Sequence, residues 1–248
     1  MTDTPARATP LSAAPAQRIA WIDRARGVAL IAMIVYHFSF DLSFLGIVDW
    51  PVGGHPLWRG FAMAIAGSFI ALAGLSLAIA AQGGLRWRPY LRRLLRIAAA
   101  AAVVTVATWA AMPWPVWFGI LHAIATFSVL ALPFVLLPAR IGAPAAALAG
   151  IVVFAGQWLF VSPIFASPWL TPLGLSPTPL PSFDYEPIFP WFALMLLGVA
   201  LAPVVPLRRG PVAGDPVARM GRNSLAIYLL HQPILLGLLI AAQRIGLI

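Results

Sequence analysis

Seven long apolar runs constrain the fold of this chain more than any other feature of its sequence. A helix needs roughly 20 mostly apolar residues to cross a lipid bilayer, and each run is about that long. Only 9% of the residues are charged and the mean hydropathy is +0.91, unlike any ordinary soluble domain. We therefore predict an all-α, polytopic membrane bundle with about seven spans, at residues 27–47, 58–82, 94–112, 116–137, 144–162, 187–206 and 223–245.

The arginines predict how these spans are oriented. All 16 basic residues are arginine, and alternating sides along the spans leaves every one of them on the same face except Arg59 and Arg244. By the positive-inside rule that face is cytoplasmic, so the N-terminus is predicted inside and the C-terminus outside. The net charge of +9 is thus explained by topology, and no nucleic-acid partner is expected.

The remaining segments predict one domain with a tail and an outer loop. Residues 1–18 are polar and Pro-rich, which indicates a disordered cytoplasmic tail, and residues 19–248 are predicted to form a single transmembrane domain. The segment before the sixth span has too many prolines to cross a membrane. It is either a lid or acceptor-binding element, or a simple connector. The lack of cysteine excludes disulfides, thiolate metal sites and a cysteine nucleophile.

Ionisable side chains inside the apolar runs indicate a function. Such groups are costly in lipid, so they usually face the bundle interior. His37 and Asp41 lie one helical turn apart in the first run, and His122 and His231 lie in the fourth and seventh. An aspartate one turn from a histidine can accept the imidazole N–H and make the other ring nitrogen more basic. The pair predicts a general base; the alternative is a buried ion pair that only orients helices.

Metal binding and phosphate binding are the other chemistry that these polar residues could provide. The histidines are scattered over three predicted helices and a loop, with no tight ligand spacing, so no metal site is predicted. Arginines near 24–26 and 86–96 could hold an anionic cofactor, because guanidinium groups match phosphates well. Lipid headgroups are the alternative partners of these arginines.

Five stretches of the sequence are similar to a known enzyme family. They are RIAWIDRARGVALIAMIVYHFSFDL, AGSFIALAGLSLA, FGILHAIATFSVLALPF, PIFPWFALMLLG and GRNSLAIYLLHQP. From Arg18 to Pro233 the chain resembles the bacterial branch of the heparan-α-glucosaminide N-acetyltransferase catalytic-domain family, within the transmembrane acyltransferases. The resemblance implies a multi-pass enzyme of the bacterial inner membrane. Such an enzyme transfers an acyl group, typically acetyl from cytoplasmic acetyl-CoA, to a sugar-like acceptor on the far side.

The resemblance also implies which residues are catalytic. In the wider superfamily an arginine, ten intervening residues and a histidine mark the first catalytic helix, and Arg26 and His37 have that spacing. The heparan enzyme has asparagine at the histidine position and uses a histidine in an H-x-x-W-x-G context, which His55 fits in HPLWRG. Either His37, oriented by Asp41, or His55 is therefore expected to bear the acyl group or to remove a proton.

Donor and acceptor contacts follow from the same resemblance. The phosphates of CoA are expected to bind arginines at the cytoplasmic face, namely Arg24, Arg26, Arg92, Arg93, Arg96 and Arg222. The acceptor side and the path toward it are expected to involve Arg59, His122, Asp184, Glu186, Asn223 and His231.

The chain departs from the family in size. Relatives characterised as enzymes have ten or eleven spans, whereas this sequence predicts seven. It could be a minimal enzyme, one half of a homodimer that completes the site, or a member that has lost activity. Two alternatives come from other classes: a proton-coupled small-molecule transporter with His37 and Asp41 as its protonation switch, and a catalytically silent scaffold.

Overall fold

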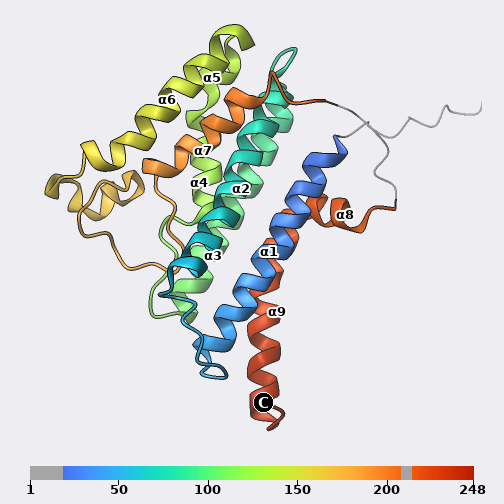
Figure 1. The fold of residues 1–248 in the computed structure, drawn as a ribbon, viewed down its shortest axis with the longest axis vertical. Coiled ribbons are helices and arrows are strands. Elements are labelled where there is room, and N and C mark those ends of the chain that lie inside the picture. The colour runs from blue at the N-terminus through green and yellow to red at the C-terminus, as the bar shows by residue number, and fades with distance from the viewer. Residues whose placement is uncertain (1–18, 208–213) are drawn as a thin grey trace, which may run out of the picture.

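The computed structural model describes residues 19–207 and 214–248, and the regular elements in these ranges are helices (Figure 1). The predicted tail, residues 1–18, lies outside the described residues. Five helices are long and apolar enough to cross a membrane: α1 (Ala20–Phe44), α2 (Pro56–Ala81), α3 (Trp87–Ala111), α6 (Ala139–Leu159) and α9 (Ser224–Arg244). The prediction of an all-α, polytopic membrane protein is confirmed.

Shorter apolar helices take the place of the other two predicted spans. The run 116–137 is divided into α4 (Ile120–Leu130) and α5 (Leu132–Leu136). Pro133 causes this break, because it has no N–H to donate to the carbonyl four residues earlier. The run 187–206 contains α7 (Ile188–Leu201), and the short helix α8 (Pro216–Arg222) precedes α9.

The Pro-rich outer segment is a loop, as predicted. Between α6 and α7 it contains only two short 3₁₀ helices, η1 (Pro163–Ala166) and η2 (Pro168–Leu173). Its last residues return to the bundle, where the amide of Glu186 donates to the carbonyl of Phe118 at 2.9 Å. The loop therefore ends against the start of α4, which determines where its carboxylates lie.

The helices are arranged around α2 and α7. Figure 1 shows α1 and α9 along one side of the molecule and α6 on the opposite side. The main apolar core lies between α2, α4, α6 and α7, where Ile70, Phe127 and Met195 are fully buried. α1 packs on α2, α8 and α9, so the first and last spans are neighbours. We call the end of the bundle with Arg24 and Arg26 the predicted cytoplasmic end, and the end with His55 the predicted outer end.

The outer surface of the bundle suits a lipid environment. Large apolar side chains are mostly exposed on the outward faces of the long helices, among them Trp109, Leu148 and Ile151. In water such a surface would be unstable, whereas in a bilayer it contacts acyl chains. Trp158 and Trp169 are exposed near the predicted outer end, where indole rings favour the lipid–water interface.

Two glycines determine how closely α2 and α7 approach. A Cβ on Gly74 would lie 2.1 Å from the carbonyl oxygen of Met195, and one on Gly198 would lie 2.1 Å from that of Ala71. No real side chain fits at these distances, so the two backbones are in direct contact. Small residues at helix crossings are a common basis of packing in membranes.

Replacing Gly74 by alanine should destabilise the protein by about 1–3 kcal/mol, because the added methyl forces α2 and α7 apart. Gly60→Ala is the matched control on the same helix: a Cβ there meets nothing within 4 Å, and alanine is the better helix former by up to about 1 kcal/mol. Thermal unfolding in detergent should thus shift in opposite directions for the two variants. Equal shifts would contradict the close contact.

Candidate functional site

Two histidines far apart in the sequence meet between α1 and α9. The ring centroids of His37 and His231 are 4.9 Å apart; we call them the histidine pair. His231 is buried and His37 is half-buried. One turn further along α1, the Oδ1 atom of Asp41 accepts a hydrogen bond from Nε2 of Gln232 at 2.6 Å. A ring contact and a hydrogen bond therefore join α1 and α9 within about one helical turn.

The hydrogen bond of His231 determines which ring nitrogen is protonated. Its Nδ1 is 2.7 Å from the backbone carbonyl of Tyr228. A carbonyl only accepts, so Nδ1 carries the hydrogen and the lone pair is on Nε2. Within the described ranges, Nε2 is buried and has no hydrogen-bond partner. A neutral imidazole with an unengaged nitrogen is the form that a general base requires.

Asp41 is oriented by α9 instead of by its neighbour on α1. The sequence predicted that it accepts the imidazole N–H of His37. In the structure its Oδ1 binds Gln232, and its Oδ2 has no partner among the residues described. The spacing of four residues does place both side chains on one face of α1. However, that face is covered by α9, so each side chain meets a residue of α9.

Asp184 connects the outer loop to the histidines. Its Oδ2 accepts hydrogen bonds from the amide of Ile120 at 2.9 Å and from the hydroxyl of Tyr228 at 3.5 Å. A carboxylate is favourable there, because the first amides of α4 are free and carry the positive end of the helix dipole. The negative charge of Asp184 also acts on His37 and His122. The outer loop and three of the four histidines therefore belong to one polar cluster.

Glu186 is a second carboxyl group in this cluster, and it is buried. Its Oε2 is buried without a partner in the described part of the chain, and Asp184 is close enough for its negative charge to act on this group. Burial raises the pKa of Glu186 well above its ordinary value, and the negative charge of Asp184 raises it further. The surroundings thus favour the protonated, neutral form of this side chain.

The presence of His122 inside an apolar run is explained by a hydrogen bond between two helices. Its Nε2 lies 3.1 Å from the hydroxyl oxygen of Thr105, and that hydroxyl donates to the carbonyl of Val116 at 2.8 Å. The hydroxyl hydrogen is therefore engaged, so Nε2 of His122 is the donor in the contact with Thr105. The bond joins α3 to α4. A role of His122 in substrate binding stays a prediction.

His55 lies outside the polar cluster. Its Nδ1 accepts from the amide of Leu57 at 3.2 Å and so caps α2, and both His55 and Arg59 are exposed. The motif does approach α1, because the ring of Trp58 is 6.1 Å from that of Tyr36. The structure thus places HPLWRG near the predicted outer end of α1, at the surface.

The predicted phosphate-binding arginines lie at the predicted cytoplasmic end, and two of them are already bonded. Arg24 pairs with Asp215, which caps α8, and Arg26 binds both Asp23 and Ser76. These contacts join α1 to α8 and to α2. An anionic ligand at Arg26 would compete with Asp23.

The other predicted arginines are distributed around the same end. Arg93 of α3 is half-buried and close enough to Arg26 to experience its charge, whereas Arg92 and Arg96 are exposed. Arg222 is half-buried at the end of α8. Asn223 follows it, with its side-chain amide donating to the carbonyl of Arg219 at 2.9 Å. Asn223 is thus on the predicted donor side of the bundle.

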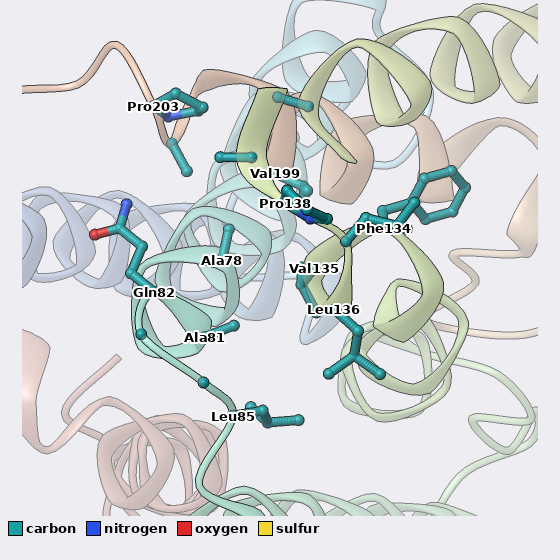
Figure 2. Close-up of a pocket in the computed structure, with 16 residues that line it drawn as sticks. Ala78, Ala81, Gln82, Leu85, Phe134, Val135, Leu136, Pro138, Val199 and Pro203 are labelled. Atoms are coloured by element: carbon teal, nitrogen blue, oxygen red, sulfur yellow. The ribbon is translucent and has the colours of Figure 1, made fainter. Parts of the chain in front are cut away.

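Two adjoining cavities open at this end. The first, of about 440 Å³, has a mainly apolar lining from the ends of α2, α5 and α7, and Figure 2 shows Ala78, Phe134 and Val199 around it. The second, of about 580 Å³, includes Arg26 and Arg86. Both contain the turn at residues 82–84, so they are neighbours. Their volumes are in the range of small-molecule sites. Neither of these two cavities is lined by the histidine pair.

Comparison with known proteins decides the family. The model of the family described as "Heparan-alpha-glucosaminide N-acetyltransferase, catalytic" matches residues 18–233, which include the histidine pair and the outer loop. The chain belongs to this family. No curated protein and no solved structure matches it significantly. Membership of the heparan-α-glucosaminide N-acetyltransferase family assigns the chain to the transmembrane acetyltransferases and confirms the resemblance seen in the sequence.

Two residues of the polar cluster, Tyr228 and Gln232, were not predicted from the sequence. Tyr228 and Gln232 lie four residues apart in GRNSLAIYLLHQP, so they share a helix face, and that spacing was the available signal. Their importance comes from contacts with Asp184 and Asp41, which are 44 and 191 residues away. In the described ranges, no group of three or more His, Asp and Glu side chains is arranged to hold a metal ion.

The pKa of Glu186 leads to a prediction about stability. With its pKa raised in the folded state, the native protein binds more protons than the unfolded chain. The free energy of unfolding should therefore fall as the pH rises from about 5 to about 8, because the unfolded chain releases this proton more readily than the folded protein does. Glu186→Gln should be more stable than the wild type at about pH 8 and should depend less on pH.

Thermal unfolding of detergent-purified protein over this pH range measures the effect. Asp49→Asn serves as the control, because Asp49 is an exposed carboxylate on the same side of the bundle. It should follow the wild-type curve. Parallel curves for the wild type and Glu186→Gln would show that Glu186 does not retain its proton in the fold.

Proposed function

We propose that the protein transfers an acetyl group from cytoplasmic acetyl-CoA to an amino or hydroxyl group of a sugar-like acceptor on the outer side of the bacterial inner membrane. Family membership supports acetyl transfer. The observation that carries the proposal is the histidine pair, because two imidazoles in contact inside an apolar bundle are costly unless they have a function. The free Nε2 of His231 supports base catalysis there.

Acetyl-CoA binds from the predicted cytoplasmic end in this proposal. The cavity that includes Arg26 and Arg86 would hold its phosphates, since guanidinium groups bind phosphate through paired hydrogen bonds. Arg93 adds positive charge to Arg26 from α3. The remaining arginines proposed to surround the nucleotide are Arg24, Arg92, Arg96 and Arg222. The pantetheine arm would then extend along α1 toward His37, which is about 16 Å from Arg26 along the helix.

Acetyl transfer takes place at the histidine pair. The acceptor N–H or O–H gives its proton to Nε2 of His231 while the nitrogen or oxygen attacks the thioester carbonyl. The C–S bond breaks, and the leaving CoA thiolate takes that proton from the imidazolium. His37 donates a ring N–H to the carbonyl oxygen as it becomes negative, which stabilises the transition state. His55 and Arg59 contact the acceptor at the outer surface, with Asp184 and Glu186 at the inner end of its path.

Substituting the pair tests this assignment. With purified protein, acetyl-CoA and glucosamine, His231→Ala and His37→Ala should each lower kcat by about 10²–10⁴, because a general base or an oxyanion donor is lost. The Kd for acetyl-CoA should change less than about twofold, since neither residue is at the arginine-lined cavity. His55→Ala separates the two assignments: a loss of kcat there with unchanged pair variants would move the chemistry to the outer surface.

Substituting the arginines tests the donor site. Arg26→Ala and Arg86→Ala should weaken acetyl-CoA binding by about tenfold or more, as expected for the loss of a charged hydrogen bond. Arg244→Ala is the control, because Arg244 is at the opposite end of the bundle. Isothermal titration with acetyl-CoA and competition by free CoA give the affinities. Wild-type protein that does not bind acetyl-CoA would contradict the transferase and favour the transporter or scaffold.

A further inference from the structure

The outer loop between α6 and α7 has an exposed apolar surface that the function proposed so far does not use. Large apolar side chains are exposed from the end of α6 to η2, namely Leu159, Phe160, Val161, Ile164 and Trp169. Ile164 is 74% exposed and Trp169 is 91% exposed. Single exposed apolar residues are normal, whereas several in one short segment mark a surface that contacts a partner.

Other residues of the loop are packed against the bundle. Thr171 and Leu175 are buried, and the hydroxyl of Tyr185 donates to the carbonyl of Thr171 at 2.7 Å. Gly174 has a φ of 78°, and a Cβ there would lie 2.5 Å from the Cβ of Pro187. The loop is therefore held in place by its own contacts. Its exposed side chains are those that no helix covers.

The sequence of this segment does not suit contact with water. Between Arg140 and Asp184 it contains no Asp, Glu, Lys, Arg or His. Surfaces that face water normally carry such residues, because charged side chains favour exposure. The uncharged run includes both α6 and the loop, so the loop continues the composition of the membrane-spanning helix before it.

The exposed surface of the loop also continues the lipid-facing side of α6. Leu148, Ile151 and Trp158 lie on one side of this helix, and all three are exposed. Figure 1 shows the loop, in yellow to orange, beside the end of α6 and on the side of the molecule away from α1 and α9. The bilayer that covers this side of α6 therefore reaches the loop as well.

The backbone of the loop determines how deep it can lie. Irregular backbone does not enter the hydrocarbon core, because its polar groups would lack partners there. Near the headgroups the demand is smaller, and this loop has few free amides. Pro163, Pro168 and Pro172 have no N–H, and the amide of Ser162 donates to the carbonyl of Leu175 at 3.1 Å. Indole rings such as that of Trp169 also favour this level.

We propose that Ile164 and Trp169 insert into the outer leaflet and anchor the outer loop to the phospholipid surface beside α6. The two side chains lie about 5–10 Å below the lipid phosphates, as in other interfacial segments. The loop is then neither a free lid nor a simple connector. Because Tyr185 bonds Thr171 of η2 and directly follows Asp184, the anchored loop also fixes the position of that carboxylate.

Spin labels test the insertion. The sequence contains no cysteine, so a single introduced cysteine carries the nitroxide. Ile164→Cys and Trp169→Cys are labelled in nanodiscs of phosphatidylethanolamine and phosphatidylglycerol. Both labels should collide often with oxygen, which concentrates in lipid, and rarely with Ni(II)-EDDA, which stays in water. Their nickel collision rates should be about threefold or more below that of a label at Thr178, because interfacial burial excludes the complex.

Two positions give the reference values. Thr178→Cys is an exposed site in the polar part of the same loop, and Ile151→Cys is on the lipid-facing side of α6. Labels at Ile164 and Trp169 should resemble the label at Ile151. Frequent nickel collisions at both would place the surface in water and overturn the proposal. Rare collisions with both reagents would also overturn it, because protein, such as a second copy of this chain, would then cover the surface.

Tryptophan fluorescence gives a measurement without a label. The sequence has ten tryptophans, so the difference between the wild type and Trp169→Phe isolates the emission of Trp169. Lipids brominated near the headgroup should quench this difference about twofold more strongly than lipids brominated near the chain end, as expected for an interfacial indole. No quenching by either lipid would overturn the insertion of Trp169.

Discussion

The functional cluster depends on the contact between α1 and α9. Each helix is mostly apolar and suits lipid on its own, yet each carries ionisable or amide groups on one short stretch. Where those stretches meet, the side chains are shielded from acyl chains. His37 then contacts His231, and Asp41 accepts a hydrogen bond from Gln232. In a bilayer the alternative, a polar group in hydrocarbon, is so unfavourable that this contact also specifies how the first and last spans pack.

The outer loop contributes the carboxylate of Asp184 to the site between α1 and α9. Asp184 binds the first amide of α4 and the hydroxyl of Tyr228, so one carboxylate joins the loop, α4 and α9. Gly119 allows this approach, because a Cβ there would lie 2.2 Å from the carboxylate. Arginines gather at the opposite end of the bundle. Asp184 and Glu186 therefore lie at the end of the bundle opposite to the cavity that contains Arg26 and Arg86.

Element types were more predictable than contacts. All seven apolar runs contain helices, because backbone groups in lipid must be satisfied within the segment itself. The division at Ala131 was not foreseen, although Pro133 is its cause. His37 and Asp41 were correctly expected on one face, but not the hydrogen bond from Gln232 that Asp41 accepts. The spacing of residues on one helix specifies a face, whereas the partner depends on which other helix covers it.

By itself the sequence determined a polytopic helical membrane protein, the predicted orientation of its spans, its family and the presence of costly polar groups inside apolar runs. These features follow from local properties of the sequence: the length of each apolar run, the positions of the arginines, and the free-energy cost of placing a charged side chain in lipid. Only the tertiary structure decided that His37 faces His231, that Gln232 holds Asp41, and that His55 caps a helix at the surface. Those contacts join residues far apart in the chain, and helix packing alone brings them together.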